Sequence, residues 1–166
     1  MNKEKISYLL MDVDGTLTDG KIYVSPSGES MKVFNVKDGY AIKNILSNEG
    51  IIPVIITGRE SVCLQNRANE LNIRYVYQGV CDKKKFFSSL IRKNEININE
   101  TAFIGDDLND MELMKYIKQN GGYIGCPKDA ARQVTEIADF ISCRNGGDGA
   151  VREFVEYIVS KGKDKL

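Results

Sequence analysis

The sequence predicts an α/β fold in which a doubly wound, mostly parallel sheet carries a protruding β-hairpin and no cap domain. Short apolar runs at 6–11, 51–56 and 101–104 are too brief for helices and read as strands buried on both faces. Segments with helical patterning alternate with these runs, as in a parallel sheet whose crossovers are helices. The 166 residues, 42% of them hydrophobic, suffice for one core, so we expect a single domain over 1–166.

The remaining elements follow the same alternation. Asp38 fits the cap of the first predicted helix, and Gly50 fits its stop. No internal repeat, low-complexity tract or interdomain linker interrupts the pattern. Further strands are predicted at 75–77, 122–124 and 139–141, and helices at 38–48, 61–71, 83–93, 111–117, 128–137 and 148–159.

Two carboxylates, Asp12 and Asp14, leave the carboxyl end of the first strand and are followed by Gly15. Open α/β sheets bind ligands at this end, and glycine lets the chain turn and expose backbone N–H groups. Two acids one residue apart are costly unless a cation or a proton neutralises one of them. The pair therefore suits a carboxylate nucleophile assisted by Mg2+, whereas the alternative is an acidic turn that happens to follow a strand.

Three more strand ends carry polar groups. Thr57 follows the 51–56 run, Lys83 follows the 75–77 strand and its loop, and an acidic cluster follows 101–104. Taken singly, each could be a solvated loop. Their order at consecutive strand ends (carboxylate pair, hydroxyl, lysine, carboxylate cluster) favours one shared phosphoryl site. The acidic cluster comprises Asp106, Asp107 and Asp110.

These four segments resemble motifs one to four of the haloacid dehalogenase superfamily of phosphotransferases, over nearly the whole chain. The resemblance implies a Rossmann-like core and an aspartyl-phosphate intermediate on Asp12. Asp14 would be the general acid/base, and Thr57 and Lys83 would hold the phosphoryl group. The metal site would comprise Asp12, the backbone carbonyl of Asp14, and Asp106, in keeping with the oxygen ligands that Mg2+ prefers.

Two acids keep alternative roles. Asp107 or Asp110 would touch a metal-bound water or Lys83, or Asp110 would instead cap a helix starting near Met111. Two other classes of protein also share parts of the pattern. A phosphorelay receiver domain has its lysine last, so the acidic cluster after Lys83 disfavours it. A catalytically retired assembly domain is disfavoured by the intact set of motif residues, which includes Asp12.

Most members of this superfamily select substrates with a cap domain, and the intervals 14–57 and 57–83 hold too little for one. The first interval contains a hairpin flap, 18–36, with strands predicted at 21–24 and 31–34 around a turn at 25–28. A two-stranded hairpin is marginally stable alone. Its apolar residues therefore pack on the parent domain or against other subunits, which would supply the missing lid. These residues are Ile22, Val24, Val33 and Phe34.

Segments 34–40, 56–59, 77–79 and 145–153 resemble the capless sugar-acid phosphatases. The best-known members of that family hydrolyse 3-deoxy-D-manno-octulosonate 8-phosphate (KDO 8-phosphate), which is the function implied here. The family is tetrameric, with hairpins and carboxyl-terminal tails (144–166 here) reaching neighbouring subunits, so a homotetramer is implied. The matching substrate-binding positions are Asn35, Val36, Lys37, Asp38, Gly39, Gly58, Arg59 and Arg67, together with Lys43 in place of an arginine.

Because the sequence departs from the octulosonate pattern at several positions, a nine-carbon sugar acid phosphate stays an alternative substrate. Segment 125–130 lacks the usual alanine-histidine-proline and looks more like the sialate branch, as does 142–147, while Asp148 stands where an arginine is common. The alternative substrate is therefore N-acylneuraminate 9-phosphate or KDN 9-phosphate. Because one branch is fused to animal CMP-sialate synthetases, a retired oligomerisation domain is the more distant alternative.

An acidic sugar also fits the chemistry of the chain. Arg59 and Arg67 lie roughly two helical turns apart, so both can lean toward the site, where the planar fork of arginine suits a carboxylate. The alternative for each is a solvated helix face. The glycines at 146, 147 and 149 either form a flexible linker or let the backbone approach a ligand closely, as a tail inserted into a neighbour's site would need.

The amino-acid composition limits the classes of partner that we expect for the chain. The formal net charge is +0, with 23 basic and 23 acidic residues, which gives no indication of nucleic-acid binding. No run reaches the roughly 18 apolar residues of a membrane span, and the N-terminus is too polar for a secretory signal. The 4 cysteines form no close pair and histidine is absent, so we expect no zinc site. We expect a cytoplasmic enzyme acting on a small-molecule sugar-acid phosphate, with no nucleic-acid or membrane partner.

Overall fold

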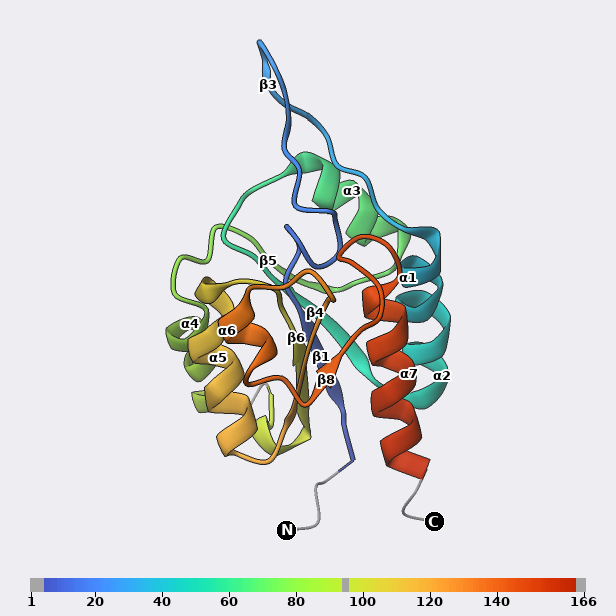
Figure 1. The fold of residues 1–166 in the computed structure, drawn as a ribbon, viewed down its shortest axis with the longest axis vertical. Helices are drawn as coiled ribbons and strands as arrows, with labels where there is room; N and C mark the ends of the chain where they lie inside the picture. The colour runs from blue at the N-terminus through green and yellow to red at the C-terminus, as the bar shows by residue number, and fades with distance from the viewer. Residues whose placement is uncertain (1–4, 94–95, 164–166) are drawn as a thin grey trace.

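The computed structural model describes residues 5–93 and 96–163, and the predicted doubly wound parallel sheet is confirmed in them. Its strands are β1 (Tyr8–Met11), β4 (Ile52–Ile56), β5 (Tyr75–Tyr77), β6 (Thr101–Ile104), β7 (Tyr123–Cys126) and β8 (Phe140–Ile141). They pair in parallel in the order β5-β4-β1-β6-β7-β8 (Figure 1). Met11 lies beside Ile55 on one side and Ile104 on the other, so β1 ends in the middle of the sheet.

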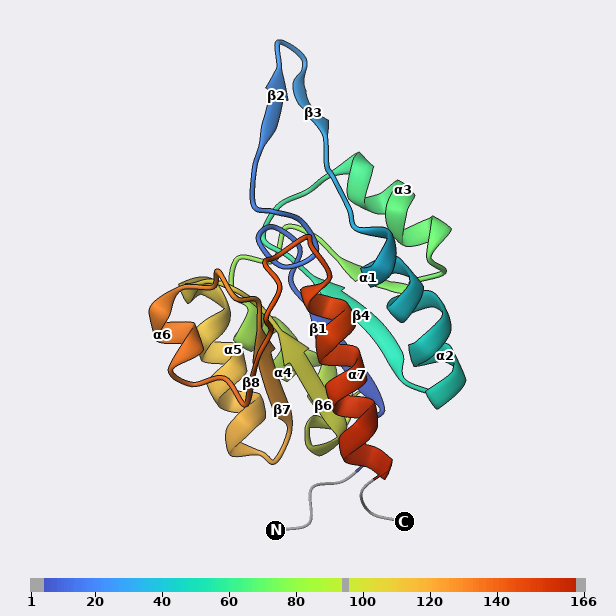
Figure 2. The ribbon, with the colours of Figure 1, turned by 45° about the vertical axis from the view of Figure 1, so that its right-hand side comes forward.

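Helices cover both faces of the sheet, as Figures 1 and 2 show. One face carries α1 (Val36–Tyr40), the π-helical turn η1 (Ala41–Ile45), α2 (Leu46–Glu49), α3 (Val62–Glu70) and α7 (Ala150–Lys163). The other carries α4 (Lys83–Arg92), α5 (Leu108–Gln119) and α6 (Arg132–Thr135). A short 3-10 turn, η2 (Ile98–Glu100), precedes β6. No cap domain is present among the described residues, as predicted.

Each face of the sheet buries its own core, and β1 contributes to both by side-chain alternation. Leu9 and Met11 pack with side chains of α3 and α7, whereas Leu10 packs with those of α4 and α5. All three are fully buried. Because burying such a side chain stabilises the fold by about 1.5–3 kcal/mol, the strand that delivers Asp12 is held firmly in place.

The hairpin stands out from the carboxyl ends of the strands (Figure 2). It consists of β2 (Tyr23–Ser25) and β3 (Gly28–Met31), so the turn predicted at 25–28 is confirmed. The prediction of a strand at 31–34 is wrong, since β3 ends at Met31. The reason is that Lys32 turns toward the body of the domain instead of continuing the ladder.

Most predicted helices agree with the structure within a few residues. The helix predicted at 38–48 begins earlier because Oδ1 of Asn35 caps it, accepting the N–H of Lys37 at 2.8 Å. The helix predicted at 128–137 shrinks to α6, because the preceding residues form turns in which Ala131 donates to the carbonyl of Asp106 at 2.8 Å.

The predicted tail 144–166 is mostly α7, and its residues 164–166 lie outside those described. The inner side of α7 buries Val151, Phe154 and Ile158 in the core. Across residues 5–93 and 96–163, no helix has the length and apolar character needed to cross a bilayer.

Candidate active site at the carboxyl ends of the strands

Asp12 follows β1 directly and is only 4% exposed. Its Oδ1 accepts a hydrogen bond at 2.5 Å from Nζ of Lys83, the first residue of α4. The same ammonium donates to Oδ1 of Asp110 at 2.5 Å, and Lys83 is itself buried. The fold thus brings the first carboxylate and the lysine together from positions 71 residues apart.

A tight turn follows Asp12. The carbonyl oxygen of Val13 accepts hydrogen bonds from three backbone N–H groups that follow it, at 2.9–3.2 Å. Gly15 adopts a left-handed conformation with φ of 97°, and a Cβ there would lie 2.0 Å from Oδ2 of Asp106. Only glycine meets both requirements, so the turn can pass closely over the second acidic motif.

The acids after β6 take different positions. Asp106 lies under the turn, and its Oδ1 accepts the hydroxyl of Thr16 at 3.0 Å. Asp107 is exposed and caps α5, accepting the N–H of Leu108 at 2.8 Å. The helix therefore begins at Leu108 rather than near Met111, because Asp107 occupies the cap position.

Asp110 is fully buried and joins both parts of the cluster. Its Oδ2 accepts the backbone N–H groups of Asp106, at 3.1 Å, and Asp107, at 3.4 Å, as the second half of a capping box. Its Oδ1 holds Lys83. Asp110 therefore fixes the direction of the ammonium while its own oxygens are fully engaged.

The buried acids carry more negative charge than Lys83 balances. Burial raises the pKa of Asp12 to about 6, the nearby Asp110 adds to the rise, and Lys83 opposes it. Burial also raises the pKa of Asp106 to about 8, with the charges of Asp12 and Asp110 adding. Burial alone would lower the pKa of Lys83, but the two carboxylates it contacts outweigh burial and raise it.

This charge pattern fits a divalent cation. Carboxylate oxygens of Asp12, Asp106 and Asp110 lie within 4.8 Å of one another. Because Asp110 already binds Lys83 and two backbone N–H groups, Asp12 and Asp106 are the carboxylates available to a metal. A small set of buried carboxylate oxygens is the ligand type that Mg2+ prefers.

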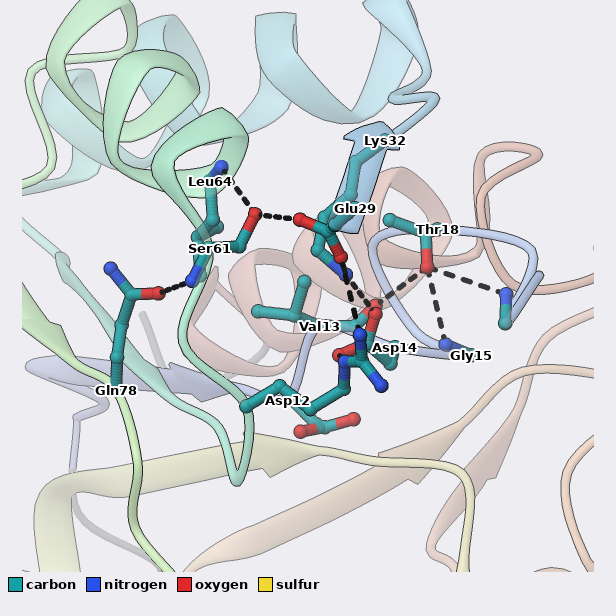
Figure 3. A network of polar contacts seen from close by, with 12 residues as sticks. Asp12, Val13, Asp14, Gly15, Thr18, Glu29, Lys32, Ser61, Leu64 and Gln78 are labelled. Atoms are coloured by element: carbon teal, nitrogen blue, oxygen red, sulfur yellow. Dashed lines mark hydrogen bonds and ion pairs between the residues drawn. The ribbon is translucent and has the colours of Figure 1, made fainter. Parts of the chain in front are cut away.

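Asp14 lies on the side of the turn that faces the hairpin, as Figure 3 shows. Its Oδ1 accepts a hydrogen bond from the ammonium of Lys32, and its Oδ2 lies 3.8 Å from Nε of Arg59. Thr57 and Gly58 follow β4, the strand beside β1, and Thr57 is buried. The hydroxyl-bearing loop therefore leaves the sheet next to the carboxylate pair.

The predicted substrate positions at the start of α1 separate into two groups. Asn35, Asp38 and Gly39 line a mainly apolar crevice of about 10 Å³ with Arg67, and a Cβ at Gly39 would lie 2.3 Å from Nη2 of that arginine. Nε of Arg67 is buried without a hydrogen-bond partner in the described part of the chain. Val36 and Lys37 are exposed in the first turn of α1.

Asp38 and Lys43 have other partners. Asp38 is buried, and its carboxylate accepts the N–H groups of Gly149, at 3.2 Å, and Arg152, at 2.8 Å, at the start of α7. Burial raises the pKa of Asp38, while these backbone hydrogen bonds oppose the rise. Lys43 donates to the carbonyl of Glu70 at 2.8 Å. The side chains of Asp38 and Lys43 are thus directed to α7 and to the end of α3, away from the Asp12 cluster.

The glycines of 145–149 pack on the turn after β1 of the same chain. A Cβ at Gly146 would lie 1.8 Å from the carbonyl oxygen of Gly15. The N–H of Gly147 donates to the carbonyl of Thr16 at 3.0 Å, and that of Gly146 donates to Oδ1 of Asp129 at 2.9 Å. The expectation of a flexible linker is therefore wrong, and the close approach of this backbone is made to the chain's own site.

We expect Gly146→Ala to lower the free energy of unfolding by about 3 kcal/mol and to reduce kcat, because the added methyl must displace the turn behind Asp12. Gly121→Ala is the matched control: it has φ of 89° but open space, so it adds backbone strain of about 1 kcal/mol and leaves kcat unchanged. Urea denaturation and phosphate release measure both effects. Equal losses for the two variants would contradict the proposed contact.

Two hairpin residues, Glu29 and Lys32, reach the site without having been predicted to do so. The side chain of Lys32 is only 3% exposed and binds Asp14, and Glu29 hydrogen-bonds the hydroxyl of Ser61. The one sequence feature that could have indicated this contact is that Lys32 lies between the apolar Met31 and Val33, three residues after Glu29. In a regular strand residues three apart face opposite sides, so the spacing alone did not indicate a pair.

The chain is similar to known phosphatases. A family model described as haloacid dehalogenase-like hydrolase matches residues 75–154. The 3-deoxy-D-manno-octulosonate 8-phosphate phosphatase KdsC of Escherichia coli (strain K12) is 38% identical over 156 residues, which are 94% of this chain and 80% of that protein. KdsC of Yersinia pestis is 38% identical over 161 residues, covering 97% and 83%.

Solved structures give the same result. A 3-deoxy-D-manno-octulosonate 8-phosphate phosphatase from Moraxella catarrhalis, in complex with magnesium, phosphate and KDO, superposes with a TM-score of 0.86 at 36% identity, covering 96% of this chain and 88% of that one. The cobalt-bound enzyme from Haemophilus influenzae superposes with a TM-score of 0.88 at 31% identity, covering 98% and 92%. The likeness therefore extends over both faces of the sheet and the hairpin.

Proposed function

The chain belongs to the 3-deoxy-D-manno-octulosonate 8-phosphate phosphatases of the haloacid dehalogenase superfamily, and from that premise we propose that it hydrolyses KDO 8-phosphate to the free sugar acid and phosphate. It is a phosphoric monoester hydrolase. The observation that carries the proposal is the position of the buried Asp12 at the carboxyl end of β1. It is hydrogen-bonded to Lys83 and lies next to Asp106. This arrangement suits a carboxylate that attacks phosphorus.

The reaction proceeds in two transfers. Lys83 binds Oδ1 of Asp12, which leaves Oδ2 to bond to phosphorus while the bond to the sugar oxygen breaks. Asp14 gives its proton to that departing oxygen, then accepts one from the water that cleaves the aspartyl-phosphate. Thr57 and Lys83 bind phosphoryl oxygens, and Lys83 keeps its charge because Asp110 also holds it.

Mg2+ is the proposed cofactor. Asp12 and Asp106 would bind it through their carboxylates and Asp14 through its backbone carbonyl, which fits the excess negative charge of the cluster. When bound, the ion supplies charge neutralisation for the phosphoryl oxygens. The protein's own contribution is the fixed direction of the carboxylates, set by the turn at Gly15 and the hydroxyl of Thr16.

Arginines near the site support an acidic sugar as the substrate. Arg59 is 44% exposed beside Asp14, and Arg67, whose Nη1 pairs with the exposed carboxylate of Glu70 at 2.7 Å, adjoins Asn35 and Gly39. A guanidinium suits the carboxylate of a keto-sugar acid, so these are the proposed specificity residues. Lys43 and Asp38 are not retained as direct contacts. Lys43 lies with residues around the start of β4, and the carboxylate of Asp38 is engaged by N–H groups at the start of α7.

A phosphate-release panel with Mg2+ tests the substrate. We expect kcat/KM for KDO 8-phosphate to exceed that for neutral hexose phosphates by at least about tenfold, since one charge-assisted contact is worth about 1.5–3 kcal/mol. N-acylneuraminate and KDN 9-phosphates are the discriminating comparison. A higher kcat/KM for either would establish the nine-carbon alternative, and no release from any substrate would favour the retired domain.

A homotetramer is the proposed assembly. The hairpin exposes apolar side chains along its length. A protruding two-stranded ribbon with such a surface needs a partner, and a symmetric copy of the chain supplies one. The exposed residues are Ile22 (49%), Val24 (72%), Met31 (51%) and Val33 (51%).

Introducing Val24→Asp with Val33→Asp is expected to dissociate the tetramer and to lower kcat/KM for the sugar-acid phosphate, because charges replace the buried apolar contact. Turnover of small aryl phosphates should survive. Lys21→Asp, on the same hairpin, changes the net charge equally without touching the apolar surface and should remain assembled. Light scattering decides the state, and a fully active, discriminating wild-type monomer at assay concentration is incompatible with this proposal.

We also propose a cytoplasmic location. The four cysteines are free rather than paired in disulfides, as expected in a reducing compartment. Two of them, Cys81 and Cys143, are exposed. Fractionation of the cells that produce the protein would test the location.

A further inference from the structure

An ionic chain connects the base of the hairpin to Asp14 (Figure 3). The ammonium of Lys32 binds Oδ1 of Asp14 and lies 3.2 Å from Oε1 of Glu29. The side chain of Lys32 is 3% exposed, that of Glu29 16% and that of Asp14 20%. A lysine so withdrawn from water needs its two carboxylate partners, so the three groups hold one another in fixed positions.

A β-bulge directs both hairpin charges to the same side. Tyr23 pairs with Met31 while the next residue, Val24, pairs with Glu29, so Ser30 is an extra residue in β3. The hydroxyl of Ser30 donates to the carbonyl of Tyr23 at 3.0 Å and closes the bulge. Because an extra residue resets the alternation of side chains, Glu29 and Lys32 can meet although they are three apart.

Glu29 is in turn braced by the body of the domain. Its Oε2 accepts the hydroxyl of Ser61, the residue that caps α3. The backbone N–H of Ser61 donates to Oε1 of Gln78 at 2.7 Å, and Oε1 of Glu29 lies 3.5 Å from Arg59. The Ser61 hydroxyl and the Lys32 ammonium outweigh burial and lower the pKa of Glu29, so it stays ionised.

We propose that Lys32, aimed by Glu29, is a positioning residue for the acid/base step. This inference rests on the proposed function, in which Asp14 serves that step. Since Lys32 occupies Oδ1 of Asp14, Oδ2, the oxygen on the side of Arg59, is left as the oxygen that exchanges the proton of the acid/base step. In the first transfer a proton passes from Oδ2 to the sugar oxygen as the bond of that oxygen to phosphorus breaks and the bond from Asp12 forms.

Leaving-group dependence tests the assignment. A sugar alkoxide must be protonated as it departs, whereas p-nitrophenolate leaves without a proton. Lys32→Met, which keeps the length of the side chain, should lower kcat/KM about 10- to 100-fold for the sugar-acid phosphate and for benzyl phosphate, a small substrate whose alkoxide also needs a proton. It should lower kcat/KM for p-nitrophenyl phosphate less than about threefold. Glu29→Gln should give a smaller loss that again falls mainly on substrates whose leaving group needs a proton, which we call the leaving-group bias. Lys32→Arg should recover most of the activity.

Lys21→Met is the matched control, because Lys21 lies at the base of the same hairpin but is exposed and pairs only with Asp19 among the described residues. It should leave all three kcat/KM values within about twofold of wild type. If Lys32→Met lowers kcat/KM for the sugar-acid phosphate alone and spares benzyl phosphate, Lys32 merely fastens the hairpin, and this would overturn the inference. Equal losses on benzyl phosphate and p-nitrophenyl phosphate would also overturn it, because the loss would then not depend on the leaving group. If Lys32→Met does not fold, the bias of Glu29→Gln decides in the same way.

Asp14→Asn separates failure of this inference from failure of the proposed function. If Asp14→Asn shows the leaving-group bias and the Lys32 and Glu29 variants do not, the positioning role is overturned and the function stands. If Asp14→Asn lacks the bias, the acid/base assignment fails and the inference fails with it. Bias in all three variants, with recovery by Lys32→Arg, supports the positioning role.

Discussion

Asp12→Asn should reduce kcat by at least about 10^4-fold while leaving the fold intact, because an amide cannot attack phosphorus. The side chain is hydrogen-bonded to Lys83 and lies close to Asp106 and Asp110, so the substitution removes one buried charge without changing the shape of the site. Phosphate release under single-turnover conditions measures the loss. Circular dichroism and urea denaturation should show a native domain.

Glu112→Gln is the control for loss of a carboxylate as such. Glu112 is an exposed residue of α5 that pairs with Lys84 and Lys115 at the surface. Its replacement should leave kcat within about twofold of wild type, since surface pairs contribute little. Turnover of Asp12→Asn within about tenfold of wild type would remove Asp12 from the role of nucleophile.

Removing divalent metal with EDTA should abolish turnover, and Mg2+ should restore it, whereas Ca2+ should inhibit because its larger, looser coordination spoils in-line geometry. The metal-free protein should also lose stability as the pH rises. Folding raises the pKa of Asp12 from 3.8 to about 6 and that of Asp106 from 3.8 to about 8. At both groups the folded state therefore binds protons more tightly than the unfolded state. The stability that this difference contributes is fully present below about pH 4 and is lost as the pH rises to about 8.

Mg2+ should oppose this loss, because the ion supplies the charge that the protons supplied at lower pH. Urea denaturation at about pH 5 and about pH 8, with EDTA or Mg2+, measures the effect. We expect the stabilisation by Mg2+ to be larger at the higher pH. Asp106→Asn should flatten the dependence on pH in EDTA, and full activity after exhaustive chelation would contradict the proposed site.

The central strands and their polar ends were predictable because each is encoded locally. A buried strand such as β1 shows as a short apolar run, and Asp12 and Gly15 follow it in the next few residues. Parallel strands end at one edge of the sheet, so local motifs sufficed to place Lys83 beside Asp12.

Contacts that depend on side-chain direction across long separations were not predictable in this way. Asp38 resembles a cap for its own helix, yet its carboxylate binds the start of α7, more than a hundred residues later. Lys32 looks like a surface residue of a hairpin until the bulge at Ser30 turns it toward Asp14. Gly146 has no local signal that its backbone touches Gly15.

The π-helical turn η1 makes the segment from Val36 to Glu49 sensitive to single-residue gain or loss during evolution. Such a turn carries one residue more than a regular helix of the same rise. Losing that residue would rotate the start of the segment by about 100° relative to its end. Leu46 would stay in the core while Asp38 and Gly39 swung away from α7 and Arg67. An ungapped alignment with a relative that lacks the extra residue would therefore pair side chains that point about 100° apart around this helix.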